Sequence, residues 1–190
     1  HFIVTHASHN IGYAYDEDWT YDGFHPWGYT SFDAYYRDVD TNTVELRFVS
    51  GDQWRLFNDT TSWVIGTRVK NNKEDLLRQY TYADGDFVSQ YQPITQAVYG
   101  QLESQLTNDL LLTFALRAEN YDFSYGDNAG LNGEHDSTML GGKLALSYQL
   151  GQQLVYASVS RGYKGAGINP DQNVSTDNRF YDEEYNWNYE

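Results

Sequence analysis

Hydrophobic and polar residues alternate with a period of two along most of the chain. In residues 112–119, for example, Leu112, Phe114 and Leu116 alternate with more polar neighbours. Similar alternation runs through residues 44–48, 98–106 and 143–150. Successive side chains of a β-strand point to opposite faces, so this pattern predicts half-buried strands with one apolar and one polar face. No helical period is sustained for more than about a turn, and the chain is therefore predicted to be all-β.

The alternating segments predict about eight antiparallel strands. Their approximate ranges are 2–15, 31–49, 61–71, 94–106, 110–124, 138–150, 154–164 and 184–190.

The predicted connections alternate between short and long. Thr107–Asp109 and Gly151–Gln153 read as tight turns, with Gly51–Thr60 as a longer connection at the same end. The long, polar and acidic connections are Tyr15–Thr30, Asn71–Gln92, Gly126–Ser137 and Gly165–Glu183. Short turns at one end and long loops at the other are typical of outer-membrane β-barrels, whose turns are periplasmic and whose loops are extracellular.

The two faces of such strands would meet different surroundings. The apolar face is predicted to contact lipid, and it holds Leu46, Phe48, Leu112, Phe114, Leu116, Leu144 and Leu146. The opposite face mixes charges of both signs, which a wet barrel lumen tolerates better than lipid does. It holds Glu45, Arg47, Arg68, Glu103, Arg117, Glu119 and Lys143. The alternative is that these charges form the solvated face of a soluble sheet.

Composition narrows the class further. The chain has 190 residues, with 27 Asp and Glu against 12 Lys and Arg, and this acidic balance argues against nucleic-acid binding. It has no cysteine, which excludes disulfides and thiolate metal sites. No apolar run approaches the roughly 18 residues of a transmembrane helix. Barrel strands give a much weaker signal and are not excluded.

Aromatic residues are abundant, with 18 Tyr, 9 Phe and 5 Trp. Two groups lie at predicted outer strand ends and are expected to form an aromatic girdle at the lipid–water boundary. The first group is Tyr13, Tyr15, Trp19 and Tyr21, and the second is Tyr121, Phe123 and Tyr125. The alternative is an aromatic cluster under a loop in the core of a soluble protein.

Candidate chemistry is sparse. His6 and His9 are an odd number of residues apart, so on one strand they point to opposite faces and make poor joint metal ligands. The acidic loop around Asp18 lacks the ligand spacing of a calcium loop. No nucleophile, zinc-protease or phosphate-loop motif is present. The chain is therefore predicted to be no enzyme and to have no metal site or cofactor.

Two segments near the C-terminal end carry a family resemblance. Tyr156–Asn169 reads YASVSRGYKGAGIN and Tyr181–Glu190 reads YDEEYNWNYE. Together they resemble the late barrel strands of TonB-dependent outer-membrane receptors, where similar segments flank a loop. Glu183 stands where that family usually has Pro, and Ala166 where it often has Gly.

The resemblance implies a 22-stranded barrel filled by an N-terminal plug, which imports a scarce nutrient, typically a ferric siderophore, across the bacterial outer membrane. The implied partners are outer-membrane lipid, the small ligand, and TonB acting through the plug. Residues 1–190 are expected to hold a partial barrel domain without a plug. Ligand contacts are expected in the outer loops, with Tyr80, Tyr82, Tyr91 and Arg179 as candidates.

Two other readings stay open at this point. One is a complete, small eight-stranded outer-membrane barrel, since eight strands can close. The other is a soluble secreted β-sandwich that binds carbohydrate through exposed Tyr and Trp.

Overall fold

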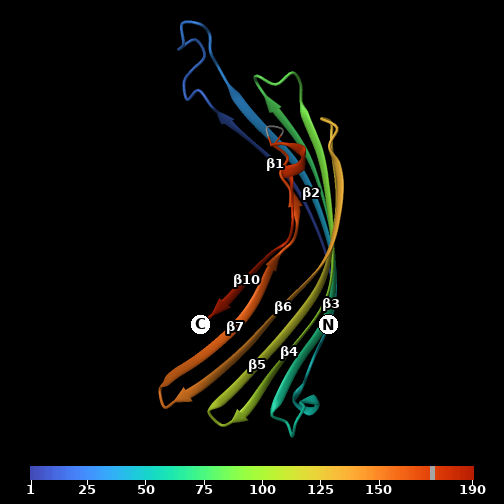
Figure 1. Ribbon diagram of the computed structural model, residues 1–190, viewed down its shortest axis with the longest axis vertical. Helices are drawn as coiled ribbons and strands as arrows, with labels where there is room; N and C mark the ends of the chain where they lie inside the picture. Colours follow the sequence, from blue (N-terminus) through green and yellow to red (C-terminus); the bar gives the residue numbers. More distant parts are fainter. Residues whose placement is uncertain (172–173) are drawn as a thin grey trace.

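The computed structural model describes residues 1–171 and 174–190, and it is almost entirely β-sheet (Figure 1). One antiparallel sheet has eight strands in the order β1-β2-β3-β4-β5-β6-β7-β10. These are β1 (Phe2–Asp16), β2 (Phe32–Val49), β3 (Thr61–Tyr80), β4 (Phe87–Thr107), β5 (Leu110–Asp127), β6 (Asn132–Leu150), β7 (Gln153–Lys164) and β10 (Glu184–Tyr189). A second, two-stranded ladder joins β8 (Gly167–Ile168) to β9 (Phe180–Tyr181). Two short 3-10 turns cover Asp52–Trp54 and Thr176–Asn178.

The all-β prediction is confirmed, and the topology decides between its variants. β1 and β10 are the two edges of the large sheet, so these eight strands do not close into a small barrel of their own. A sandwich needs two sheets packed face to face, whereas the described residues form one large sheet with a two-stranded ladder beside it. Both alternatives are therefore wrong. Within the described residues, no helix has the length and apolar character needed to cross a membrane.

The connections gather at two ends of the sheet, as Figure 1 shows. At the turn end lie residues 50–60, 108–109 and 151–152, and at the loop end lie residues 17–31, 81–86, 128–131, 165–171 and 174–183. The segregation of short turns from the longest loops is confirmed. The predicted extents of two loops, however, are wrong. Asn71–Gln92 is mostly strand, because β3 continues to Tyr80 and β4 begins at Phe87, and the third loop shrinks to residues 128–131.

The extra strand length has a physical cause that is visible on β5. Its even-numbered residues are apolar from Leu110 to Ala118, but Asn120 and Asp122 then occupy the same face. An apolar stretch of about nine residues is what a tilted strand needs to cross a bilayer. β3 and β4 are 20 and 21 residues long, about twice that need. Beyond the apolar band both faces of a strand can be wet, so alternation stops before the strand does.

Strand register confirms the division into two faces. Glu45, Arg68 and Glu119 lie in one cross-strand row through Ala97. Phe114 pairs with Leu144 on the opposite face. We call the face with Arg47 and Arg117 the polar face, and the face with Phe114 and Leu144 the apolar face.

Tyrosines on the polar face form two similar units. The Tyr99 hydroxyl donates to Glu45 Oε1 at 2.5 Å and accepts from Arg47 Nε at 3.2 Å. To reach them the ring crosses β3 at Gly66. In the second unit the ring of Tyr163 crosses β6 at Gly141, and its hydroxyl accepts from Arg117 Nε at 3.0 Å.

In that second unit Arg117 is also held by Glu119 of its own strand. Each unit thus joins three neighbouring strands through one tyrosine and fixes one arginine against the sheet.

The main buried cluster lies on the polar face near the loop end. Phe123 is 0 % exposed and Tyr125 6 % exposed, and both pack against Ala166 of the long β7–β10 connection. The expectation that Tyr121, Phe123 and Tyr125 form a boundary girdle is therefore wrong, because these rings lie in or against a buried cluster under a loop. Their odd numbers place them on the same face as Arg117, which was the available signal.

Candidate functional site

A hollow of about 840 Å³ opens on the polar face at the loop end of the sheet. Residues of β2 and β3, the first residue of β4 and three connections contribute its walls. The lining comprises Tyr35 and Arg37 of β2, Leu76, Arg78 and Tyr80 of β3, residues 82–87, Asn128 and Ala129 in the β5–β6 turn, and Asn169–Asp171 of the β7–β10 connection. The sequence-based candidates Tyr80 and Tyr82 both lie here, so the structure brings these two together.

Arg78 makes a two-pronged ion pair in the wall of the hollow. Its Nε and Nη2 donate to the two carboxylate oxygens of Asp33 at 2.8 and 2.6 Å. The Tyr35 hydroxyl donates to the same carboxylate at 2.9 Å. The guanidinium also lies 5.3 Å from the Tyr35 ring centre and 5.4 Å from that of Tyr80. A two-pronged Arg–carboxylate pair fixes orientation as well as charge, so Arg78 holds both rings in place.

Arg37 is the second cation of the hollow and pairs with Glu74 on β3. Because both arginines already have carboxylate partners, their charges are largely balanced within the wall. The sequence-based reasoning missed Arg37, Arg78 and Asp33. It assigned part of β3 to a loop, and so it could not place Arg78 opposite β2.

Tyr80 and Tyr82 form an aromatic surface at the rim. Their ring centres are 6.0 Å apart in an edge-to-face arrangement. Tyr82 also stacks on Tyr29 of the β1–β2 connection at 5.9 Å and donates to the Thr30 carbonyl at 2.9 Å. Tyr82 remains 56 % exposed, so it joins two loops and still offers surface to a ligand.

Tyr91 lies apart from this hollow, in the buried cluster under the β7–β10 connection. Its hydroxyl shares a hydrogen bond with that of Tyr121, and its ring centre is 5.3 Å from that of Phe123. Ile168 and Phe180 cover the cluster from the connection. Tyr91 therefore forms part of the floor on which this connection rests.

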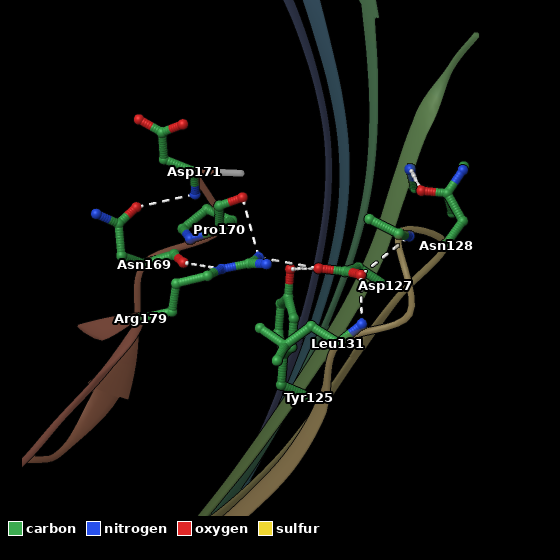
Figure 2. Close-up of polar contacts among 10 residues, drawn as sticks. Tyr125, Asp127, Asn128, Leu131, Asn169, Pro170, Asp171 and Arg179 are labelled. Atoms are coloured by element: carbon green, nitrogen blue, oxygen red, sulfur yellow. Dashed lines mark hydrogen bonds and ion pairs between the residues drawn. The ribbon is translucent and has the colours of Figure 1, made fainter. Parts of the chain in front are cut away.

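Arg179 lies where the β7–β10 connection meets the β5–β6 turn (Figure 2). Its Nη2 donates to Asp127 Oδ2 at 3.0 Å and to the Pro170 carbonyl at 3.1 Å, and its Nε donates to the Asn169 carbonyl at 2.9 Å. The side chain is only 6 % exposed, and that of Asp127 is 0 % exposed. Arg179 thus adjoins the hollow through the backbone that it holds.

The acidic β1–β2 connection uses its carboxylates to fold itself. Asp18 accepts from Thr20 Oγ1 at 2.7 Å and from the Ser31 amide at 2.8 Å. These two hydrogen bonds, that of Thr20 first, lower the pKa of Asp18 from an ordinary 3.8 to about 2. Glu17 accepts from the Ser31 hydroxyl at 2.7 Å. Among the described residues, no group of three or more His, Asp or Glu side chains converges in a way that could hold a metal ion.

Arg161 and Lys164 of the C-terminal motif both contact aromatic rings. Arg161 lies 3.9 Å from the Tyr185 ring centre, and Lys164 lies 5.3 Å from that of Tyr181. Cation–π contacts of this kind are attractive. These two cations of the motif are therefore held against rings of β9 and β10.

Comparison with known proteins agrees with this architecture. The family description "TonB dependent receptor-like, beta-barrel" matches residues 2–190. No sequence among the curated proteins matches the chain.

Two solved structures share the fold. The ferric yersiniabactin uptake receptor FyuA from Yersinia pestis aligns over 84 % of this chain and 26 % of its own, at 21 % identity and a TM-score of 0.69. The copper transporter OprC aligns over 86 % of this chain and 28 % of its own, at 13 % identity and a TM-score of 0.60. The chain thus spans roughly a quarter of the length of either structure. Since the family match covers almost every residue, the chain belongs to the TonB-dependent receptor-like β-barrel family.

Proposed function

We propose that residues 1–190 form part of the barrel wall of a bacterial outer-membrane receptor that imports a ferric siderophore. In this proposal the apolar face contacts outer-membrane lipid, the polar face lines the lumen, and the loop end faces outward. The receptor would capture its ligand at the loop end and take energy for import from TonB, acting through a plug domain. The chain has a transport role and carries out no catalysis.

The membrane placement is supported by the exposure of the apolar face. Phe48 is 54 % exposed, and Leu116 and Leu144 are each 47 % exposed. Soluble proteins rarely expose large contiguous apolar patches. On this sheet the apolar residues form a continuous band, with charged residues on the other face, as in barrels that separate lipid from a wet lumen.

The hollow at the loop end is the observation that carries the ligand proposal. Tyr80 and Tyr82 present aromatic surface at its rim, and Arg78 is held behind them between Tyr35 and Tyr80. Binding sites for small molecules are concave, mostly lined by apolar and aromatic groups, and carry a few fixed polar groups. The organic part of a metal chelate offers rings and methylenes that pack on such a wall.

The two solved neighbours favour a metal-bearing cargo. FyuA is described as a ferric yersiniabactin uptake receptor and OprC as a copper transporter. Between a chelate and a bare ion, the tyrosine-lined hollow favours the chelate because aromatic rings pack against organic groups.

Titration of the full-length receptor in detergent micelles would test this proposal. The probes are three ferric complexes, one each of a catecholate, a hydroxamate and a phenolate siderophore, and binding is followed by quenching of intrinsic fluorescence. We expect at least one complex to bind. Replacing Tyr80 and Tyr82 by Ala should weaken its affinity about tenfold, since each lost ring contact is worth roughly 0.5–1.5 kcal/mol.

The matched control is Tyr156→Ala. Tyr156 is 56 % exposed, as Tyr82 is, but it lies on β7 toward the turn end. Its replacement should leave the affinity unchanged. Failure of all three complexes to bind the wild-type receptor would contradict the siderophore proposal. An equal loss of affinity in the Tyr80/Tyr82 variant and in Tyr156→Ala would show that the hollow is not the binding site.

A further inference from the structure

We propose that Asp127 and Arg179 are the positioning pair of the ligand-binding hollow, fixing Asn169–Asp171 as one of its walls. This inference rests on the proposed function for its ligand. It assigns Arg179 a role other than ligand contact, and it gives Asp127 a role that the sequence did not suggest.

Burial is the first argument. The Arg179 side chain is 6 % exposed and the Asp127 side chain 0 % exposed. Buried charges are costly unless each is paired and its remaining hydrogen-bonding groups are satisfied. Here Arg179 donates hydrogen bonds to Asp127 and to the carbonyls of Asn169 and Pro170. A guanidinium so placed holds the backbone of the wall, and at 6 % exposure it offers little surface to a ligand.

The carboxylate partner is equally fixed. Asp127 Oδ1 accepts from the amides of Ala129 and Leu131, each at 3.0 Å. Its Oδ2 accepts from the Tyr125 hydroxyl at 3.0 Å in addition to Arg179. Figure 2 shows Tyr125, Leu131 and Arg179 around the Asp127 carboxylate. The β5–β6 turn therefore presents Asp127 as a rigid anchor to which the β7–β10 connection is tied.

Asn128, the next residue after Asp127, links this junction to the β3–β4 connection. The Asn128 side chain accepts from the Val88 amide at 3.0 Å and donates to the Asp86 carbonyl at 2.8 Å. Asp86, Asn128 and Asn169 all line the hollow. Asp127 and Asn128 together thus link the three connections that form its walls. The shape of the hollow depends on this junction, because the strand ladders do not extend across all three connections.

Removal of Arg179 should release one wall and leave the sheet intact. Asp127 ends β5, and the three hydrogen bonds that the Arg179 side chain donates to Asp127, Asn169 and Pro170 lie outside the ladders between the long strands. The carboxylate left behind would be buried without its cation, which is unfavourable. We therefore expect the wall to move away from Asp127, and ligand affinity to fall without loss of the barrel.

Spin-label distances in the full-length receptor in detergent micelles would test the pair. Labels are placed at Gly85→Cys in the β3–β4 connection, where an added Cβ meets nothing within 4 Å, and at the exposed Asp177→Cys. The wild type should give one narrow distance distribution. Arg179→Met should broaden or shift it, and should also weaken binding of the ferric complex identified above about tenfold.

The matched control is Arg55→Met at the turn end. Arg55 pairs with Asp52 at 3.0 Å, the same distance as in the Asp127 pair, but both partners are much more exposed. This variant should leave both the label distances and the affinity unchanged. If Arg179→Met prevents assembly, Arg179→Lys keeps the charge, loses the two-pronged geometry, and should broaden the distribution on its own.

The outcomes separate the two proposals. Unchanged label distances in Arg179→Met or Arg179→Lys would overturn the positioning role, whatever happens to binding. Reduced affinity at unchanged distances would make Arg179 a direct ligand contact, which also contradicts the inference. If no ferric complex binds the wild type, the proposed cargo fails, while the distance measurement still decides whether Asp127 and Arg179 hold the wall.

Discussion

The ring of Tyr99 lies directly on Gly66, so closely that a Cβ built on the glycine would be 2.5 Å from the Tyr99 Cζ and hydroxyl oxygen. Tyr163 repeats the relationship with Gly141, where the Cβ would be 2.8 Å from the tyrosine Cε1. In each unit the missing side chain lets the ring cross a whole strand and reach an arginine on the next. The two glycines are therefore needed for close approach.

We predict that Gly66→Ala destabilises the receptor by about 1–3 kcal/mol, the usual cost of overpacking. The added methyl group must displace the Tyr99 ring and break its hydrogen bonds to Glu45 and Arg47. Urea-induced unfolding from lipid vesicles measures this loss. Gly162→Ala is the control, because a Cβ there meets nothing within 4 Å. Equal stability of the two variants would contradict the packing argument.

The two faces of β6 can be tested at adjacent residues. Leu144 lies on the apolar face opposite Phe114, and Lys143 lies on the polar face opposite Ala115. Leu144→Arg should cost about 2–4 kcal/mol if that position is near the bilayer midplane, whereas Lys143→Gln should be mild. Folding titrations into lipid vesicles provide both values. Similar costs at the two positions would remove the assignment of lipid and lumen to the two faces.

The alternation of apolar and polar residues correctly predicted the strand segments that carry the apolar band. On β5, alternation from Leu112 to Glu119 placed the strand and its two faces. The tight turn predicted at Thr107–Asp109 is the observed turn at residues 108–109. Apolar and polar residues alternate along a strand only where its two faces meet different environments. At Asn71–Tyr80 both faces carry polar residues, so the pattern ended although the ladder continued to Arg78 opposite Phe87. For this reason the loop-end limits of β3 and β4 could not be predicted from the sequence.

The candidate site was predicted only in part. Tyr80 and Tyr82 were found because they lie near a real loop. Arg78 acquires its role from Asp33, which is 45 residues away in the sequence, and Arg179 from Asp127, 52 residues away. Such pairings depend on strand register and on how a loop folds back over the sheet. Neither is encoded in a local period.

The β1–β2 connection should respond to acid at Asp18. Its pKa of about 2 lies below the ordinary 3.8, so the carboxylate stabilises the folded loop above about pH 4. That contribution is lost as the pH falls through 2. Amide chemical shifts of Thr20 and Ser31, measured in micelles, should therefore titrate near pH 2. Asp18→Asn should abolish this titration, and a midpoint near 4 would show that the hydrogen bonds do not hold the carboxylate.

The last prediction concerns Phe123, which sequence reasoning placed at the lipid boundary and the structure buries completely at 0 % exposure. Phe123→Ala should cost about 3–5 kcal/mol, as for other buried phenylalanines. It should also raise hydrogen exchange in the β7–β10 connection, because Ala166 and its neighbours pack on this ring.

Replacing Phe123 with the larger Trp distinguishes a position at the lipid–water boundary from a buried one. Boundary girdles favour Trp, so a boundary Phe123 would accept Phe123→Trp without loss. A fully buried ring has no room for the larger indole, and overpacking should destabilise the protein by about 1–3 kcal/mol. The control is Phe114→Trp on the apolar face, where the side chain is 40 % exposed and the substitution should be tolerated. Unfolding in lipid vesicles distinguishes the cases, and a harmless Phe123→Trp would return the residue to the lipid boundary.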